Sequence, residues 1–275
     1  MPAPAKKRRA IINQIAEVLE SYGFVPLETP TLEFAETLLG KYGEEEKLIY
    51  QFKDRGGHSL ALRYDLTVPL ARFVANNLGL LAPSFSRYQV GQIFRGENPQ
   101  KGRYRESTQF DFDTVGAKEP EIDAKIIAAA IEAVRKIGFP EAVMVINDRE
   151  NFAGMKIEDI RAIDKIHKLG RESVRPEILT RVENTKPTQN LIQIFAILKD
   201  KYNLEEGKDF IFDKTLARGL DYYTSTIFEM KPNAKPEELS IGGGGRYDNL
   251  IGMFAGRQIP AVGFSFGIDR IVELL

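Results

Sequence analysis

The sequence contains no cysteine and only two histidines, His58 and His167. Without cysteine, the chain has neither disulfides nor thiolate metal sites. Two imidazoles argue against a histidine-based metal centre and against a Ser-His-Asp triad. No apolar run approaches the length that spans a membrane, and the basic N-terminus is not followed by the apolar segment of a signal peptide. We therefore expect a soluble, cytoplasmic protein with no membrane partner and no metal held by protein ligands alone.

A large excess of charge of either sign is also missing, because 38 basic and 39 acidic residues leave a net charge of −1. This balance argues against a protein that binds nucleic acid by bulk attraction. Any contact with RNA would have to come from local clusters such as Lys101, Arg103 and Arg105. A chain of 275 residues, 43% of them hydrophobic, is long enough for one large globular domain or one and a half.

The spacing of apolar residues predicts an α+β fold. Amphipathic helices are expected at residues 6–22, 67–77 and 120–137, and short strands at residues 24–28, 60–63 and 143–146. Because strands and helices do not alternate regularly, we predict a mostly antiparallel sheet flanked by helices. Residues 148–208 are rich in Lys and Glu, with helical stretches at residues 157–169 and 188–202 and no clear strand. We therefore divide the chain into a core of residues 1–147, a small helical insertion of residues 148–208, and the rest of the core at residues 209–275, which includes a glycine-rich turn and a terminal helix.

Residues 88–116 carry charge with a two-residue period. Arg95 and Glu97 share one face of an extended strand, as do Gln109, Asp111 and Asp113 further on. The polar connection between them suits a hairpin loop. A solvated sheet face would explain the polarity, but it would not require a cation, an amide and several carboxylates at these offsets. The pattern favours the floor of an active site.

Five segments of the chain, in this order, resemble the motifs of class II aminoacyl-tRNA synthetases in the histidyl form. They are LRYDLTVPLAR (residues 62–72), the hairpin of residues 88–116, ARGLDYYTSTIFE (217–229), GGGGRYDNLIG (242–252) and VGFSFGIDRIVELL (262–275). The arginine followed by Leu-Asp-Tyr-Tyr is the least generic, because it resembles the histidine-recognition motif of that synthetase. The resemblance implies that the chain activates histidine with ATP and Mg²⁺ and transfers it to the acceptor end of tRNA(His). It also implies a homodimer that pairs through the motif 1 region, in the first part of the core.

An aminoacyl adenylate forms when a carboxylate attacks the α-phosphate of ATP, so two anions must be held together by positive charge. Arg95 is the candidate for the catalytic contact with the α-phosphate, because a guanidinium offers a planar bidentate fork. Glu97 would orient ATP, and Arg103 from the hairpin loop would close over the β- and γ-phosphates. In the family pattern, Arg270 of motif 3 grips the γ-phosphate. The alternatives are an ordinary exposed loop arginine for Arg103 and a salt bridge to Glu273 for Arg270.

The resemblance also assigns the histidine site. Arg218 corresponds to a catalytic arginine that contacts both the substrate carboxylate and the α-phosphate. Asp65, Thr67 and Gln109 resemble the set that holds the α-ammonium, since a carboxylate, a hydroxyl and an amide oxygen all accept hydrogen bonds from it. Thr67 would serve equally well as the N-cap of the helix that follows, and the two roles can coexist.

An imidazole ring needs a partner on each of its nitrogens. Asp113 and Tyr223 resemble that pair. Tyr222 belongs to the same histidine-binding motif, although an extended backbone would point it away from Tyr223 and toward the core.

The chain departs from the family pattern at three places. Ser107 stands where motif 2 normally has an aromatic that stacks on adenine. The chain ends at Leu275 within the motif 3 helix, without an anticodon-binding domain, and it lacks a short segment that normally precedes the first helix. We therefore expect a catalytic fragment or a minimal paralogue. The glycine run of residues 242–245 permits close approach of a ligand to the backbone, but Arg246 follows where a P-loop would have lysine.

One alternative function is a non-catalytic sensor of histidine. The regulatory subunit of ATP phosphoribosyltransferase is similar to this catalytic domain and also lacks the anticodon-binding domain. A sensor could keep Asp113 and Tyr223, but it would have no need of the ATP set. That set is complete here and consists of Arg95, Glu97, Arg103, Arg218 and Arg270. The enzyme is therefore the favoured interpretation.

Overall fold

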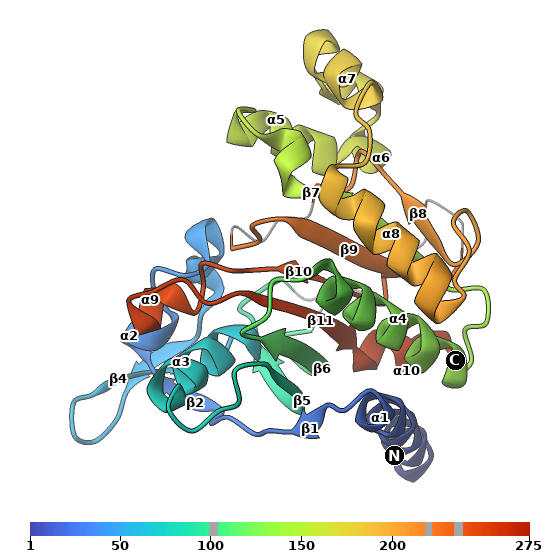
Figure 1. Ribbon diagram of the computed structural model, residues 1–275. Coiled ribbons are helices and arrows are strands. Elements are labelled where there is room, and N and C mark those ends of the chain that lie inside the picture. Colours follow the sequence, from blue (N-terminus) through green and yellow to red (C-terminus); the bar gives the residue numbers. More distant parts are fainter. Residues whose placement is uncertain (99–103, 218–221, 234–238) are drawn as a thin grey trace.

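A mixed eight-stranded sheet forms the centre of the protein in the computed structural model, which describes residues 1–98, 104–217, 222–233 and 239–275 (Figure 1). Its strand order is β1-β5-β6-β11-β10-β9-β7-β8. The strands are β1 (Val25–Pro26), β5 (Phe85–Phe94), β6 (Glu106–Val115), β7 (Val143–Asp148), β8 (Phe210–Phe212), β9 (Thr226–Lys231), β10 (Gly242–Arg246) and β11 (Ala261–Gly267). The pairs β1–β5 and β7–β8 are parallel and the other neighbours are antiparallel. The predicted mostly antiparallel α+β sheet is confirmed.

One face of this sheet is covered by four helices (Figure 1), which are α1 (Pro2–Ser21), α4 (Pro120–Lys136), α8 (Gln189–Tyr202) and α10 (Ile268–Leu274). In α1, Ile11, Ile15, Val18 and Leu19 recur at helical spacing and are buried against the sheet. In α4, proline stands in the first turn, acidic residues follow it, and basic residues occupy the last turn, as the helix dipole favours. The apolar face of α1 therefore belongs to the internal core.

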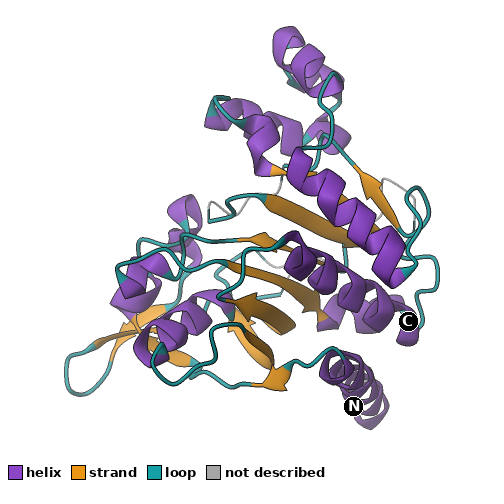
Figure 2. Cartoon of the chain, viewed as in Figure 1, coloured by secondary structure: helices purple, strands orange, loops and turns teal. Residues whose placement is uncertain are grey.

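The opposite face carries a second layer, visible beyond the main sheet in Figure 2. A three-stranded sheet in the order β2-β4-β3 packs there with short helices and α3. These elements are β2 (Leu32–Phe34), α2 (Ala35–Leu38), the 3-10 helix η1 (Gly43–Leu48), β3 (Gln51–Lys53), β4 (Ser59–Leu62), α3 (Thr67–Asn77) and α9 (Gly252–Ala255). The observed bounds of α3 equal the predicted ones.

Alternation along β6 separates the two faces of the main sheet. Phe110 and Phe112 are buried in the helix-covered core, whereas Val115 lies in the apolar cluster on the other face. Gln109 and Asp113 point to that second face, since successive side chains of a strand alternate. The polar residues of the hairpin therefore lie between the main sheet and the second layer.

Short helices follow β7 and lie outside the two layers, at the top of Figure 1. They are η2 (Arg149–Phe152), α5 (Ile157–Asp164), α6 (Ile166–Leu169), η3 (Arg171–Ser173) and α7 (Pro176–Glu183). α8 differs from them, because its buried residues Leu191, Ile194 and Leu198 join the core beneath α4. The boundaries predicted at residues 147/148 and 208/209 stay a prediction, and this packing favours a narrower insertion that ends before α8.

Two local predictions are wrong. The glycine run at residues 242–245 is the central strand β10 rather than a turn, and it pairs with both β9 and β11. Glycine is required there because an added side chain would collide with the neighbouring strand. A Cβ at Gly244 would collide with the carbonyl oxygen of Gly263. The helix expected at residues 157–169 is interrupted at Lys165 and forms α5 and α6. No helix in the described part of the chain is long and apolar enough to cross a membrane.

Candidate active site

Two adjoining cavities lie over the hairpin β5–β6, and each has a volume of about 360 Å³. Cavity A is lined by every described residue that was predicted to bind histidine: Asp65, Thr67, Gln109, Asp113, Tyr222 and Tyr223. Cavity B is lined by the described residues that were predicted to bind ATP, namely Arg95, Glu97 and Arg270, and also by Ser107. The structure therefore brings each predicted set together without testing its role.

Arg95 lies in the wall that the two cavities share. Its Nε atom donates to the carbonyl oxygen of Tyr64 at 3.1 Å, and the guanidinium stacks 4.3 Å from the centre of the Tyr64 ring. The hydroxyl of Tyr64 in turn donates to Glu45 at 2.5 Å. These contacts fix a cation at the boundary between the two cavities. Strand β5 ends at Phe94, so the prediction that Arg95 and Glu97 lie in a strand is wrong. The backbone N–H of Arg95 still donates to the carbonyl oxygen of Arg105, which extends the pairing of the hairpin by one bond.

The floor of cavity A is formed by alternate residues of β6. Gln109 and Asp113 pair with Gly267 and Gly263 of β11, and Gln109 also pairs with Gly91 of β5. A Cβ at Gly263 would collide with the carboxylate of Asp113. The glycines therefore leave the space above the strand that the polar side chains and a ligand need.

Asp65 connects cavity A to the start of α3. Its Oδ1 atom accepts hydrogen bonds from the hydroxyl of Tyr42 at 2.9 Å and from the backbone of Thr67 and Val68 at 3.2 and 3.0 Å. The other carboxylate oxygen, Oδ2, is buried and has no hydrogen-bond partner among the described residues. Burial raises the pKa of Asp65, and its hydrogen bonds partly offset that rise. Asp65, not Thr67, therefore caps the helix, and the Thr67 hydroxyl is left to face Tyr222 and the cavity.

Asp113 is held from below by a buried cation. Arg87 Nη2 lies 2.7 Å from Asp113 Oδ2, and the hydroxyl of Tyr247 donates to Oδ1 at 2.5 Å. Burial raises the pKa of Asp113, and Arg87 opposes that rise. Oδ1 is therefore oriented by a hydrogen bond, whereas Oδ2 is held by the ion pair with Arg87 and has no hydrogen-bond partner among the described residues.

The two tyrosines of the predicted histidine motif both line cavity A. Tyr223 is buried, Tyr222 is partly exposed, and their ring centres lie 5.0 Å apart. The expectation that Tyr222 points away from Tyr223 is wrong, because the two residues precede β9 and do not lie in a strand; Tyr222 does pack against the apolar core on this face.

Cavity B is bordered by the start of α10. Arg270 Nη1 donates to the carbonyl oxygen of Ser240 at 2.5 Å, whereas Glu273 accepts a hydrogen bond from Tyr104. The neighbouring Asp269 accepts from the backbone of Thr108 at 2.6 Å and pairs with Arg8. α10 is thus tied to β6 and α1, and Arg270 borders the cavity from that fixed position.

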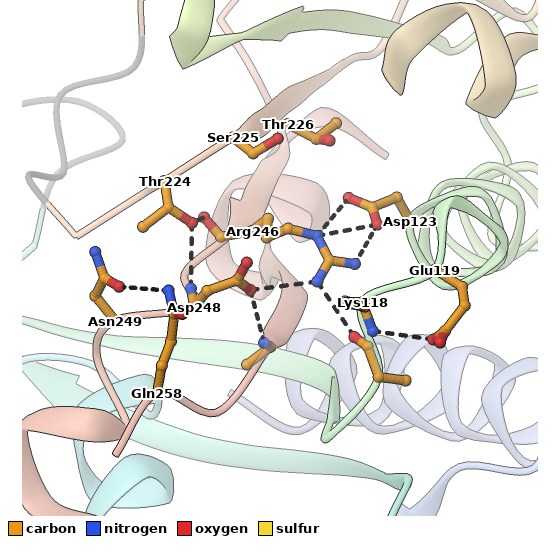
Figure 3. A network of polar contacts seen from close by, with 12 residues as sticks. Lys118, Glu119, Asp123, Thr224, Ser225, Thr226, Arg246, Asp248, Asn249 and Gln258 are labelled. Atoms are coloured by element: carbon orange, nitrogen blue, oxygen red, sulfur yellow. Dashed lines mark hydrogen bonds and ion pairs between the residues drawn. The ribbon is translucent and has the colours of Figure 1, made fainter. Parts of the chain in front are cut away.

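Arg246, which follows the glycine run, lines neither cavity, and its side chain points toward Asp123 (Figure 3). Its guanidinium pairs with Asp123 of α4, and its Nη1 atom donates to Asp248 and to the carbonyl oxygen of Ala117 at 3.2 Å each. Asp248 also accepts from the backbone of Ala261 at 3.0 Å. This network joins β10, α4 and the loop before β11. The segment of residues 242–252 therefore has two roles: Gly243 and Gly244 line cavity A, and Arg246 and Asp248 stabilise the fold.

Two predicted residues, Arg103 and Arg218, lie outside the described residues, as does Asp221. Within the described part of the chain, no group of three His, Cys, Asp or Glu side chains is arranged to hold a metal ion. Arg95 and Arg270 are the cationic residues that line cavity B among the residues whose positions are given.

Sequence reasoning assigned no role to several residues of the site. Glu45 lines both cavities, and Arg87 and Tyr247 hold Asp113. Asp111 also lines cavity A, and its spacing from Gln109 and Asp113 had already placed it on the same face. No comparable signal marked the other three, because their contacts depend on pairing between distant segments.

Comparisons with known proteins agree with this arrangement. A family model described as Histidyl-tRNA synthetase matches residues 1–154 and 153–271. Histidine–tRNA ligases of Aeropyrum pernix and Korarchaeum cryptofilum are 42% and 37% identical to the chain; each match covers 97% of this chain and 70% of the relative.

The crystal structure of histidyl-tRNA synthetase from Nostoc sp. PCC 7120 superposes with a TM-score of 0.83 at 28% identity, covering 98% of this chain and 72% of that one. A structure from Bacillus halodurans, described as an ATP phosphoribosyltransferase regulatory subunit/histidyl-tRNA synthetase, has a TM-score of 0.79 at 22% identity; it covers 100% of this chain and 80% of that one, and it shows the fold alone. With the family model and two relatives above 30% identity in agreement, the chain belongs to the histidyl-tRNA synthetase family.

Proposed function

We propose that the protein activates histidine with ATP and transfers it to the acceptor end of tRNA(His). In the first step, a carboxylate oxygen of histidine attacks the α-phosphorus of ATP. The new O–P bond gives histidyl-adenylate, and the bond to the leaving group breaks to release pyrophosphate. The observation that carries this proposal is the position of Arg95 in the wall shared by cavities A and B.

Cavity A suits an amino acid that carries several N–H donors. Asp65 Oδ2 and Gln109 Oε1 are buried acceptors with no hydrogen-bond partner among the described residues. Buried acceptors without partners are costly unless a ligand satisfies them. We assign these two atoms, with the Thr67 hydroxyl, to the α-ammonium, and Asp113 with Tyr222 and Tyr223 to the side of the imidazole.

Cavity B suits the nucleotide. Arg95 would hold the α-phosphate, Arg270 the γ-phosphate, and Glu97 the adenine amino group, with Arg103 adding charge over the β- and γ-phosphates. Mg²⁺ would enter with ATP, held mainly by phosphate oxygens and water, and would neutralise part of their charge. Arg218 would complete the catalytic pair with Arg95, as the family motif implies.

The partners follow from the same reaction. The tRNA acceptor end would reach the adenylate at cavity A, and the expected place of work is the cytoplasm. We also propose a homodimer, which pairs through the surface of the first strands. Val25, Leu32 and Phe34 on that surface are 48%, 48% and 56% exposed, and exposed apolar groups of this kind favour an interface.

A histidine sensor is the second candidate, and its fold would be the same. A sensor requires a histidine pocket such as cavity A, but it has no use for the cations that line cavity B. The shared cation Arg95 decides between the two candidates, because a sensor has no second substrate to join to the first.

The experiment is single-turnover formation of histidyl-adenylate by Arg95→Ala, with Arg55→Ala as a matched control on an exposed turn. Loss of a preorganised cation at the reacting phosphate should slow the step about 100-fold or more, while the control keeps the wild-type rate. An Arg95→Ala rate equal to that of the control would contradict the proposal.

A further inference from the structure

Asp111 occupies the centre of the floor of cavity A, between Gln109 and Asp113 on β6. Its side chain is 3% exposed, and its Oδ1 atom has no hydrogen-bond partner among the described residues. A buried carboxylate oxygen without a donor is unfavourable unless something binds it. Because Asp111 lines the cavity, the missing donor can come from a bound ligand.

The neighbours of Asp111 do not use this oxygen. On β5, Arg87 pairs with Asp113 and Gln89 exchanges hydrogen bonds with Thr29. On β11, Ser265 is paired with Asp111 in the sheet register, and its hydroxyl lies near enough to lower the pKa of Asp111 without meeting the geometry of a hydrogen bond. Among charged groups, Arg63 lies near but donates to the carbonyl oxygens of Gln92 and Thr29 at 2.7 and 2.9 Å.

Carboxylates and guanidinium groups both act on Asp111. Asp65, which precedes α3, and Asp113 on the same strand raise its pKa, Arg87 lowers it, and Arg63 is coupled to it. Asp113 already receives Arg87 and the hydroxyl of Tyr247. Among the described residues, Asp111 Oδ1 therefore has no hydrogen-bond partner and Asp111 has no ion pair, whereas Asp113 Oδ2, which also lacks a hydrogen bond, has its ion pair with Arg87.

We propose that Asp111 is a specificity-determining residue of the histidine pocket, whose unpartnered carboxylate oxygen accepts a hydrogen bond from a cationic or N–H group of the bound amino acid. This inference rests on the proposed function, because it names a contact within the same pocket. It adds a third carboxylate to Asp65 and Asp113, which the family resemblance had already singled out.

A measurable consequence is the release of a proton on binding. In the free protein, burial raises the pKa of Asp111 to about 7; Arg87 and the hydroxyl of Ser265 oppose the rise, and Asp113 and Asp65 add to it. At pH 7 the group is therefore about half protonated, and a bound cation favours its charged form. The carboxylic acid then becomes a carboxylate, and its proton passes to the buffer.

The test is calorimetric titration of histidine into the full chain at pH 7, in two buffers with different ionisation enthalpies. Wild type, Asp111→Asn and Asp54→Asn are compared; Asp54 lies on an exposed turn beside His58 and serves as the control. Relative to wild type, Asp111→Asn should release up to about half a proton less and bind histidine about tenfold more weakly, as expected for a lost hydrogen bond to a charged group. The control should match wild type in both.

Equal proton release and equal affinity in wild type and Asp111→Asn would overturn the inference. If Asp111→Asn does not fold, Asp111→Ser is the replacement, since its hydroxyl does not titrate in this range. The KM for ATP should change little in Asp111→Asn, which would show that the substitution leaves cavity B intact. Absence of any histidine binding by wild type is a different result, because it would contradict the proposed function itself.

Discussion

Arg87 and Asp113 form an ion pair of 2.7 Å beneath the cavity that carries the predicted histidine residues, and their side chains are 0% and 3% exposed. The pair has little access to solvent, and Tyr247 adds a hydrogen bond to the same carboxylate. The group assigned to recognition is therefore also part of the buried structure. If Asp113 recognises histidine as proposed, specificity and stability depend on the same contacts in this region.

Replacing Arg87 by leucine should destabilise the protein strongly. The substitution leaves Asp113 as a buried carboxylate without its cation, which costs about 3–5 kcal/mol. Urea unfolding at neutral pH measures the change. The matched control is Lys136→Ala, which breaks an exposed pair with Glu17 and should cost about 0–1 kcal/mol. If Arg87→Leu lowers the free energy of unfolding no more than the control does, the Arg87–Asp113 pair does not stabilise this face of the sheet.

Asp111→Asn should change how stability depends on pH. Burial raises the pKa of Asp111 from its ordinary value of 3.8 to about 7, so between these values the folded protein binds more protons than the unfolded chain. Stability conferred by this group therefore falls as pH rises from about 4 to 7, and the asparagine removes that dependence. The stability of the variant relative to wild type should rise by up to roughly 3 kcal/mol between pH 5 and pH 8. Unfolding curves that shift in parallel across that range would contradict the assignment.

Ser107→Phe should improve the affinity for ATP. Ser107 lines cavity B where the family pattern has an aromatic, and a ring there would stack on adenine. Such a stack is worth about 0.5–1.5 kcal/mol, so the KM for ATP should fall about two- to tenfold. Ser107→Ala is the control and should behave as wild type, and neither variant should alter the KM for histidine. An unchanged KM for ATP in Ser107→Phe would show that adenine does not lie against this position.

Asp123→Asn should lower stability without affecting either substrate. Asp123 is 1% exposed and pairs with Arg246 (Figure 3), and neither residue lines cavity A or cavity B. Loss of one charge from a buried pair should cost about 3 kcal/mol or more in urea unfolding. The KM values for histidine and ATP, measured well below the unfolding midpoint, should stay at wild-type levels. A selective rise in either KM would mean that Arg246 acts on the site after all.

Much of the fold could be predicted because local periodicity and packing agree. The bounds of α3 and α4 follow from spacing and from proline in the first turn, and the hairpin follows from the two-residue period of its charges. β10 could not be recognised as a strand, because glycines have no side chains from which a period can be read. The packing of α8 in the main core could not be predicted either, since the spacing of apolar residues in an amphipathic helix does not indicate which surface the helix covers.

The site could be predicted where a residue's role shows in its own segment. A spacing of two residues predicts a shared strand face for Gln109, Asp111 and Asp113. This prediction is confirmed, because all three line cavity A. Arg87 gave no such signal, because its burial depends on Asp113 in the strand paired with its own. Glu45 belongs to an acidic run, a pattern that is typical of a solvated surface. In the structure it accepts a hydrogen bond from Tyr64 and lines both cavities.

Adenylate formation is tested by ATP–pyrophosphate exchange measured with histidine and, separately, with each other amino acid. We expect exchange that depends on histidine alone, because the acceptors of cavity A and the cation shared with cavity B would join that substrate to ATP. Absence of exchange, with histidine still binding by calorimetry, would contradict adenylate formation and would favour a histidine sensor.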